Sequence, residues 1–371
     1  MTDADVTSLQ HTVAASAFAI AFVLGAAMNR TGFCTMGALS DVVTMGDWTR
    51  MRMWLLAIGV AVLGTQALAW SGAIDLSRSI YTGANTTWLS YLVGGALFGA
   101  GMVLASGCGS KTLVRIGGGN LKSLVVFLVL GIAAFATLRG LTAVLRVATV
   151  DAVAFEFPGG QDLPSLLAAS TGVAKGTLAA LIGIGLGGAL LAWALLRREG
   201  RSADNLLGGL GIGAVIAALW WVSGRLGHVA EHPETLQEAF LATNSQRMES
   251  LSFVAPVAYT IDWLIFFSDK SKALTIGIVS CAGVVLGSAL YALATRSFRW
   301  EGFRDARDTA HHLIGAALMG VGGVTALGCT IGQGLSGLST LSLTSFVAVA
   351  AIIAGAVAGL KYQFWLVERS A

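Results

Sequence analysis

A repeated segment that ends in a cysteine decides the fold expected for this chain. Residues 92–108 read LVGGALFGAGMVLASGC, and residues 313–329 read LIGAALMGVGGVTALGC. Ten of the seventeen positions are identical at a fixed offset of 221 residues, including the final cysteine. A fainter copy, FAIAFVLGAAMNRTGFC, occupies residues 18–34 and also ends in cysteine. Each copy is an apolar run of helical length that stops at a glycine-containing break.

The composition around these segments is that of a membrane protein. Of 371 residues, 55% are hydrophobic and only 12% are charged, about half the charged share of a soluble domain. This excludes a soluble globular enzyme, a disordered regulator and a secreted disulfide scaffold. A net charge of +3 gives no reason to expect nucleic-acid binding. The four cysteines are far apart and form no CxxC pair, so we expect no metal site and no cofactor.

Apolar runs long enough to cross a bilayer occur throughout the chain, which predicts an all-α integral membrane protein with one transmembrane domain over residues 1–371. The nine runs are 13–29, 53–70, 88–105, 122–138, 173–196, 206–223, 273–294, 311–328 and 343–366. A further apolar stretch at 251–268 contains Pro256 and Asp262. We expect it to form a re-entrant or interfacial segment rather than a tenth span.

Basic residues set the expected orientation. Three arginines lie within 197–201, after the fifth run, and four lie within 296–307, after the seventh. Lys- and Arg-rich connections stay in the cytoplasm, so nine spans place the N-terminus outside and the C-terminus inside. The acid-rich connections 139–172 and 227–250 then both lie outside.

The direction of the repeat follows from the span count. The third and eighth spans are five apart, an odd number, so they cross the membrane in opposite directions. The repeat is therefore predicted to be inverted, with four spans on each side of a linking fifth span and re-entrant loops at the breaks. The expected first half is 13–145, the linker with span five is 146–204, and the inverted second half is 205–366.

The three breaks carry the residues expected to bind a ligand. Their sequences are NRTGFCTMG (29–37), ASGCGSKT (105–112) and ALGCTIGQGLSGLST (326–340). Glycine amides approach a ligand closely, and hydroxyl and amide side chains add neutral donors, which suits a small oxyanion. A polarizable thiol suits one that contains sulfur. The candidate binding residues are Cys34, Cys108, Cys329, Gly107, Gly109, Ser110, Gly328, Thr330 and Gln333, with Thr35 and Ser336 as further donors.

Two alternatives stay open at this point. Cysteines can be small buried residues of a helix-packing motif, and Cys281, in the unbroken run IVSCAGVV, fits that interpretation best. The chain could also be a membrane-bound sulfur-transfer enzyme that uses a cysteine persulfide, because Lys111 follows Cys108 by three residues and a cation activates a thiol. No histidine or carboxylate stands in the breaks as a general base, so we predict a transporter and not an enzyme.

The breaks resemble those of the YeeE/YedE family of bacterial inner-membrane transporters of sulfur compounds. The segments that carry the resemblance are NRTGFCTMGALSD, ASGCGSKTLVRIGGGNLKSL and GGVTALGCTIGQGLSGLST, with SFRWEGFRD at 297–305. The resemblance extends over nearly the whole chain.

The resemblance implies thiosulfate uptake across the inner membrane along an hourglass-shaped path. By motif match, Cys34, Cys108 and Cys329 would line that path and pass the anion on by transient thiol contacts. A cytoplasmic TusA-like sulfurtransferase, encoded separately, would be the partner. Some relatives are linked to other sulfur or selenium species, so the substrate stays open among them.

Overall fold

The computed structural model describes residues 3–269 and 272–370, and its fold is all-α, as predicted. Each of the nine predicted spans contains one long helix. These are α1 (Asp3–Thr31), α3 (Thr49–Trp70), α4 (Trp88–Leu104), α6 (Leu121–Arg139), α9 (Lys175–Leu195), α10 (Ala203–Trp221), α12 (Ile276–Ala294), α13 (Ala306–Thr325) and α14 (Leu343–Ser370). Within the described residues, eight of them are long and apolar enough to cross a membrane. The exception is α13, whose first turns hold Arg307, Asp308, His311 and His312.

Short elements fill the connections, and the sequence did not predict them individually. The short α-helices are α2 (Thr35–Met45), α5 (Gly109–Gly117), α7 (Leu141–Ala148), α8 (Leu163–Thr171) and α11 (Ala255–Ile265). The tighter or wider turns are η1 (Leu76–Arg78), η2 (Arg198–Arg201), η3 (Val222–Leu226) and η4 (Gly332–Gly337). Two antiparallel pairs join β1 (Asn85–Thr86) to β2 (Phe155–Glu156) and β3 (His228–Val229) to β4 (Ala239–Phe240).

The stretch at 251–268 forms the short helix α11. Eleven residues of helix rise about 16 Å, which is too short to cross a hydrocarbon core of about 30 Å. Pro256 stands in its first turn, where the missing N–H costs no hydrogen bond, and Asp262 pairs with Lys272 at 2.5 Å. The geometry of α11 is that of a segment which does not span.

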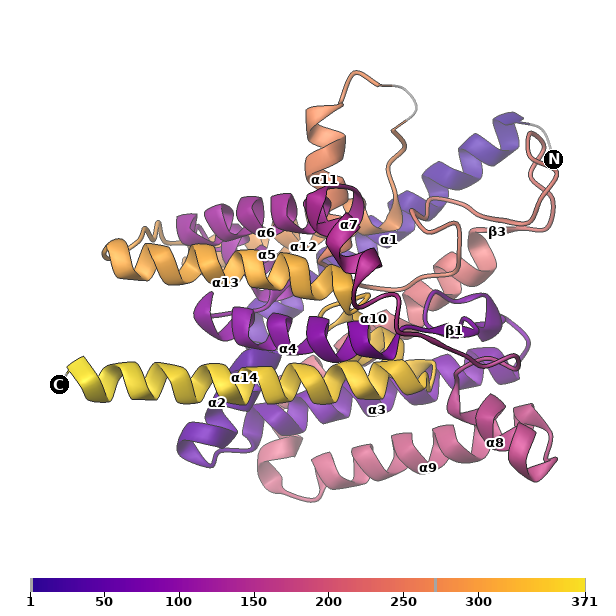
Figure 1. Ribbon diagram of the computed structural model, residues 1–371, viewed down its shortest axis with the longest axis horizontal. Helices are drawn as coiled ribbons and strands as arrows, with labels where there is room; N and C mark the ends of the chain where they lie inside the picture. The colour runs from indigo at the N-terminus through magenta and orange to yellow at the C-terminus, as the bar shows by residue number, and fades with distance from the viewer. Residues whose placement is uncertain (1–2, 270–271, 371) are drawn as a thin grey trace.

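The long helices run along the long axis of the molecule, and α1 begins at one end while α14 finishes at the other (Figure 1). We call these the N-terminal end and the C-terminal end. The count of nine spans stays a prediction, because among the described residues α13 is not as apolar as the other eight long helices.

The packing partners of the helices are exchanged between the two halves of the chain. In one pair of contacts α1 packs on α12 while α10 packs on α3. In the other, α4 packs on α14 while α13 packs on α6, and α4 and α13 pack on each other. The linking helix α9 packs mainly on α3 and α8. A two-fold relation between the halves requires this exchange.

Glycines bring α4 and α13 into backbone contact. A Cβ on Gly94 would lie 2.7 Å from the carbonyl oxygen of Gly322, and a Cβ on Gly322 would lie 2.6 Å from that of Gly94. Gly101 and Gly315 have the same reciprocal contact, at 2.7 and 2.6 Å. Any side chain here would push the two helices apart, which explains why the repeat is rich in glycine.

Candidate functional site

The three breaks share one backbone geometry. The residue two positions before each cysteine has a left-handed conformation, with φ of 65° at Gly32, 56° at Ser106 and 55° at Leu327. Glycine adopts this conformation freely, but Ser106 and Leu327 do so at a cost, since their Cβ atoms are crowded there. Strain repeated at matching positions indicates that the break itself is the feature the fold maintains.

Each cysteine begins a new turn of helix directly after the break. Its carbonyl accepts the N–H of the fourth residue on, and at Cys34 and Cys329 the sulfur also accepts the N–H of the third. The carbonyl bonds run from Ala38 to Cys34 (2.9 Å), from Thr112 to Cys108 (2.9 Å) and from Gln333 to Cys329 (2.7 Å). The sulfur bonds run from Gly37 to Cys34 (3.4 Å) and from Gly332 to Cys329 (3.5 Å), whereas the Cys108 sulfur makes its hydrogen bond with the Ser110 hydroxyl (3.3 Å). The thiol thus takes the place of a serine cap and faces backbone donors that attract an anion.

The cysteines of the three breaks lie in a buried row. The Cys34 and Cys108 thiols are close neighbours, and the Thr330 hydroxyl lies beside the Cys108 thiol. Thr330 directly follows Cys329 in the chain, so it connects the Cys108 thiol to the Cys329 thiol. The exposed fractions of Cys34, Cys108 and Cys329 are 7%, 1% and 0%. A path along these thiols is therefore closed to bulk water in this conformation.

A fourth segment, which sequence reasoning did not place in the site, lies between two of the breaks. The N–H of Phe253 contacts the Cys329 sulfur, and a Cβ on Gly109 would lie 3.6 Å from both the Cβ and the carbonyl oxygen of Phe253. The neighbouring Leu251 carbonyl accepts a hydrogen bond from Ser336 at 2.7 Å. The apolar stretch that starts at 251 thus enters the site before it turns into α11.

The other predicted site residues divide into two groups. Ser110 lies 3.3 Å from the Cys108 sulfur, and the Thr35 and Thr330 hydroxyls are buried without a hydrogen bond of normal geometry among the described residues. Gln333 instead donates to the Ala326 carbonyl at 2.6 Å and accepts from Ser345 at 2.7 Å. Gly107 and Gly328 stand directly before their cysteines, where a Cβ would lie 3.3 Å from Lys111 and 3.2 Å from Gln333 respectively. Gln333 therefore holds the break in shape with both ends of its amide.

A cavity of about 500 Å³ leads from the C-terminal end to the Cys108 break. We call it the basic cavity. It reaches Ser106 and Lys111 of the break. Its charged lining residues are the basic Lys111, Arg115, Lys122, Arg299 and Arg304 and the acidic Glu301 and Asp308. Five positive against two negative side chains leave an excess of three positive charges, which attracts anions.

Two cavities approach the Cys329 break from the N-terminal end. The first, the Glu249 cavity, has a volume of about 170 Å³ and reaches Gly328, and Ser252 also lines it. The second, of about 350 Å³, reaches Leu327 and contains Asp151. Arg146 lines both cavities and is paired with Asp151 at 3.0 Å. The net charge of the residues that line these two cavities is close to zero, in contrast to that of the basic cavity.

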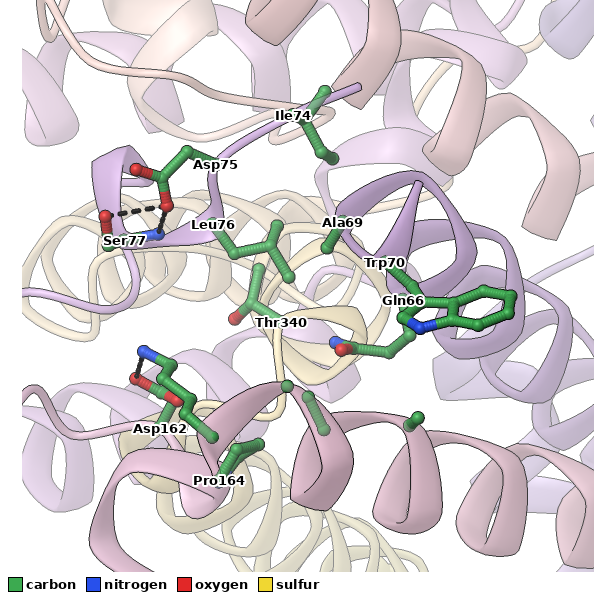
Figure 2. Close-up of a pocket in the computed structure, with 14 residues that line it drawn as sticks. Gln66, Ala69, Trp70, Ile74, Asp75, Leu76, Ser77, Asp162, Pro164 and Thr340 are labelled. Atoms are coloured by element: carbon green, nitrogen blue, oxygen red, sulfur yellow. Dashed lines mark hydrogen bonds and ion pairs between the residues drawn. The ribbon is translucent and has the colours of Figure 1, made fainter. Parts of the chain in front are cut away.

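A further cavity of about 280 Å³ lies between α3, α8 and α9 (Figure 2). Gln66 and Thr340 line it, and Gln66 donates to the Ser339 carbonyl at 2.9 Å. Asp162 on its wall is bonded to Lys175 and Ser165. No cysteine of the described residues lines this cavity, and it reaches only the back of the loop that follows Cys329.

Cys281 lies in the unbroken helix α12, as predicted, and is 2% exposed. Its thiol lies beside the Thr260 hydroxyl of α11. Among the described residues, no group of three or more potential metal ligands comes together.

The bundle of long apolar helices, with cavities at both ends and buried thiols between them, defines a multi-pass membrane protein with a closed internal path. The chain belongs to the sulphur transport family, the YeeE/YedE family, whose model matches residues 30–358. The resemblance seen in the break motifs is thereby confirmed.

Two relatives align over nearly their full lengths. The thiosulfate transporter TsuA of Escherichia coli (strain K12) is 25% identical over 342 residues, which cover 90% of each chain. The thiosulfate transporter TsuA of Spirochaeta thermophila is 25% identical over 350 residues, which cover 91% of this chain and 94% of the relative. Both relatives are named as transporters, so the comparisons do not support the sulfur-transfer enzyme considered above.

Proposed function

We propose that this chain takes up thiosulfate, or a closely related sulfur-containing anion, across the bacterial inner membrane by transient thiol contacts. The observation that carries the proposal is the buried row of Cys329, Cys108 and Cys34 between cavities at opposite ends. The names of the two relatives support the same substrate.

The path has three stages in this proposal. The anion enters the Glu249 cavity and presents its terminal sulfur to Cys329, whose thiol is a weak donor to a polarizable sulfur. It then passes Thr330 to reach Cys108 and its neighbour Cys34. From Cys108 it leaves into the basic cavity, where Lys111 and Arg115 receive it. No bond to a cysteine forms or breaks, so the thiols are unchanged after each passage.

Bare charge in a low-dielectric interior is costly, so fixed donors must replace the water that the anion loses. The backbone N–H groups at the start of each new turn supply these donors, together with the Thr35, Ser110 and Thr330 hydroxyls. Because these donors are held before the anion arrives, little reorganisation is needed.

The uptake proposal is tested with labelled thiosulfate in cells that lack other sulfur importers. Expression of the chain should restore uptake, and a vector control should not. The mass of the purified protein should be unchanged after exposure to thiosulfate. A stable gain of one sulfur atom would instead favour a persulfide enzyme.

We propose that the chain is an inverted repeat with halves at 13–145 and 205–366 around the linker 146–204. The exchange of packing partners between the halves and the reciprocal glycine contacts of α4 and α13 support it. The basic connections place the N-terminus in the periplasm and the C-terminus in the cytoplasm. Reporter fusions at Arg198 and at the C-terminus should both report a cytoplasmic position. A periplasmic signal from either fusion contradicts the nine-span arrangement.

A separate cytoplasmic TusA-like sulfurtransferase is the partner we propose at the C-terminal end. The excess positive charge of the basic cavity supports an acidic or anion-carrying partner there. Its binding to the purified transporter should weaken as the salt concentration rises, because screening shortens the reach of these charges.

A further inference from the structure

Tyr81 is a buried tyrosine whose hydroxyl forms no hydrogen bond with the described residues. Its side chain is 0% exposed, and the hydroxyl has no hydrogen-bond partner within the described part of the chain. The rest of the residue is firmly held, since its carbonyl accepts hydrogen bonds from Gln161 at 2.9 Å and from Ser342 at 2.8 Å. Its ring packs edge-on against Trp220, with centroids 6.2 Å apart. The hydroxyl is therefore fixed in place rather than free to seek a partner.

The hydroxyl lies beside Gly332, the residue whose N–H donates to the Cys329 thiol. A Cβ on Gly332 would lie 3.3 Å from the Tyr81 hydroxyl and 2.7 Å from the Ser252 hydroxyl oxygen. The N–H of the same Gly332 donates to the Cys329 sulfur at 3.5 Å. Ser252 lines the Glu249 cavity together with Gly328. The two hydroxyls thus lie against the Gly332 α-carbon, and the thiol contacts the N–H of the same residue.

Folded proteins rarely leave a buried hydroxyl without a partner, because the lost hydrogen bond to water is not replaced. An unsatisfied donor held rigidly next to a ligand path is explained when the ligand supplies the acceptor. The thiol of Cys329 can contact a terminal sulfur but leaves the oxygens of an oxyanion without donors. The Tyr81 hydroxyl, which lies beside Gly332 in the same break, can supply one such donor.

We propose that the Tyr81 and Ser252 hydroxyls form a subsite for the oxygens of the anion while Cys329 contacts its terminal sulfur. The subsite selects a small tetrahedral oxoanion that carries sulfur at one corner. This inference rests on the proposed function, and it adds two residues from outside the repeated breaks. Gly332 is required in this arrangement because a Cβ would lie 2.7 Å from the Ser252 hydroxyl oxygen and 3.3 Å from that of Tyr81, and would displace both hydroxyls.

The test compares Tyr81→Phe with the wild type in uptake of labelled thiosulfate. Loss of one hydrogen bond to a charged group should raise the half-saturation concentration by about 10- to 100-fold. The thermal stability of the purified variant should be equal or higher, since the substitution removes an unsatisfied buried hydroxyl. A purely structural role would lower stability and uptake together. Tyr291→Phe, in α12, is the matched control and should leave both measurements unchanged.

Ser252→Ala provides an independent test if Tyr81→Phe does not fold. It removes the second hydroxyl and should also raise the half-saturation concentration, by about 10-fold. If the folded variants retain the wild-type half-saturation concentration, the subsite proposal is wrong. If the wild type itself does not transport thiosulfate, the proposed function fails instead, so the two failures are distinguishable.

Discussion

The Cys108 and Cys329 breaks have the same backbone conformation, but the first faces a basic cavity and the second faces cavities that are close to neutral. Both place a left-handed residue two positions before the cysteine and bond the cysteine carbonyl to the fourth residue on. Lys111 and Arg115 follow Cys108, and Arg115 donates to the Ser106 carbonyl at 2.7 Å. Residues 313–360, around Cys329, contain no lysine or arginine at all. The repeated backbone therefore does not determine the charge at each break.

The difference follows from the water that each break can reach. A cation is tolerated near the membrane interior when it faces a wet cavity, and Lys111 lines the basic cavity of about 500 Å³. The Cys329 break meets two smaller cavities, of about 170 and 350 Å³. Neutral donors there avoid the cost of a desolvated cation. In the proposed transport direction, the anion is thus selected by geometry first and attracted by charge afterwards.

The largest effect should come from removing the feature that the two breaks share. Cys108→Ala and Cys329→Ala should each abolish or severely reduce thiosulfate uptake, because each deletes one step of the thiol row. The protein should remain folded in the membrane, since loss of one sulfur atom from a buried site leaves only a small void. Uptake of labelled thiosulfate and the amount of membrane-inserted protein are the measurements.

The other two cysteines complete this series. Cys281→Ala should be near neutral, because Cys281 lies in the unbroken helix α12. Cys34→Ala should impair uptake, because Cys34 neighbours Cys108. Wild-type uptake by Cys108→Ala would contradict the functional interpretation of the repeat.

The sequence predicts the helices well because hydropathy responds directly to the bilayer. Each of the nine apolar runs contains a long helix, and the repeat locates two breaks that share a backbone conformation. The short helices that follow the breaks, α2 and α5, do not stand out in the pattern. The Cys34 and Cys329 sulfurs each accept an N–H of the turn that follows, a role that propensity scales assign to serine or aspartate rather than cysteine.

The site is predicted less completely, because its remaining parts meet only in three dimensions. Tyr81 lies 251 positions before Gly332, and Phe253 reaches Cys329 from another connection. No local pattern marks either residue. Gln333 was predicted as an anion donor from its position in the break, yet its amide bonds the Ala326 carbonyl and the Ser345 hydroxyl. A polar side chain in a buried loop forms hydrogen bonds to the groups of that loop before it can bind a ligand.

The Cys329 break should make the protein select thiosulfate over sulfate. Unlabelled thiosulfate should compete with labelled thiosulfate far better than sulfate does, by about 100-fold, because only thiosulfate offers a terminal sulfur to Cys329. The two anions carry equal charge, so attraction by cations cannot separate them. Selenium analogues extend the same competition experiment. Equal competition by sulfate would show that the thiol does not recognise sulfur.

A smaller effect is expected from the charge that distinguishes the Cys108 break. Lys111→Met should lower uptake by about 10-fold, since it removes one positive charge beside the path and leaves the thiol row intact. Lys361→Met, on the exposed surface of α14, is the control and should leave uptake unchanged. Equal effects of the two substitutions would mean that the position of the charge is unimportant.

The smallest effect on uptake should come from Glu249, in the Glu249 cavity that leads to the Cys329 break. Its carboxylate accepts a hydrogen bond from Ser245 at 2.9 Å, and burial raises its pKa to about 7. The group is neutral below that pH and negative above it, and a negative charge repels an entering anion. The cations nearby do not cancel this charge, since Arg146 is paired with Asp151 and Arg247 contacts the Ser79 carbonyl at 3.5 Å.

Uptake should therefore fall about two- to threefold as the external pH rises from 6 to 8. Folding raises the pKa from 4.5, so the folded state also loses stability as the pH rises between 4.5 and about 7. Glu249→Gln should remove both trends, while Glu234→Gln, at an exposed position of the same connection, should retain them. A pH profile that Glu249→Gln leaves unchanged would place the titrating group elsewhere. If uptake by Glu249→Gln does not change with pH, the single carboxyl of Glu249 controls entry of the anion through the Glu249 cavity, whose other donors are neutral.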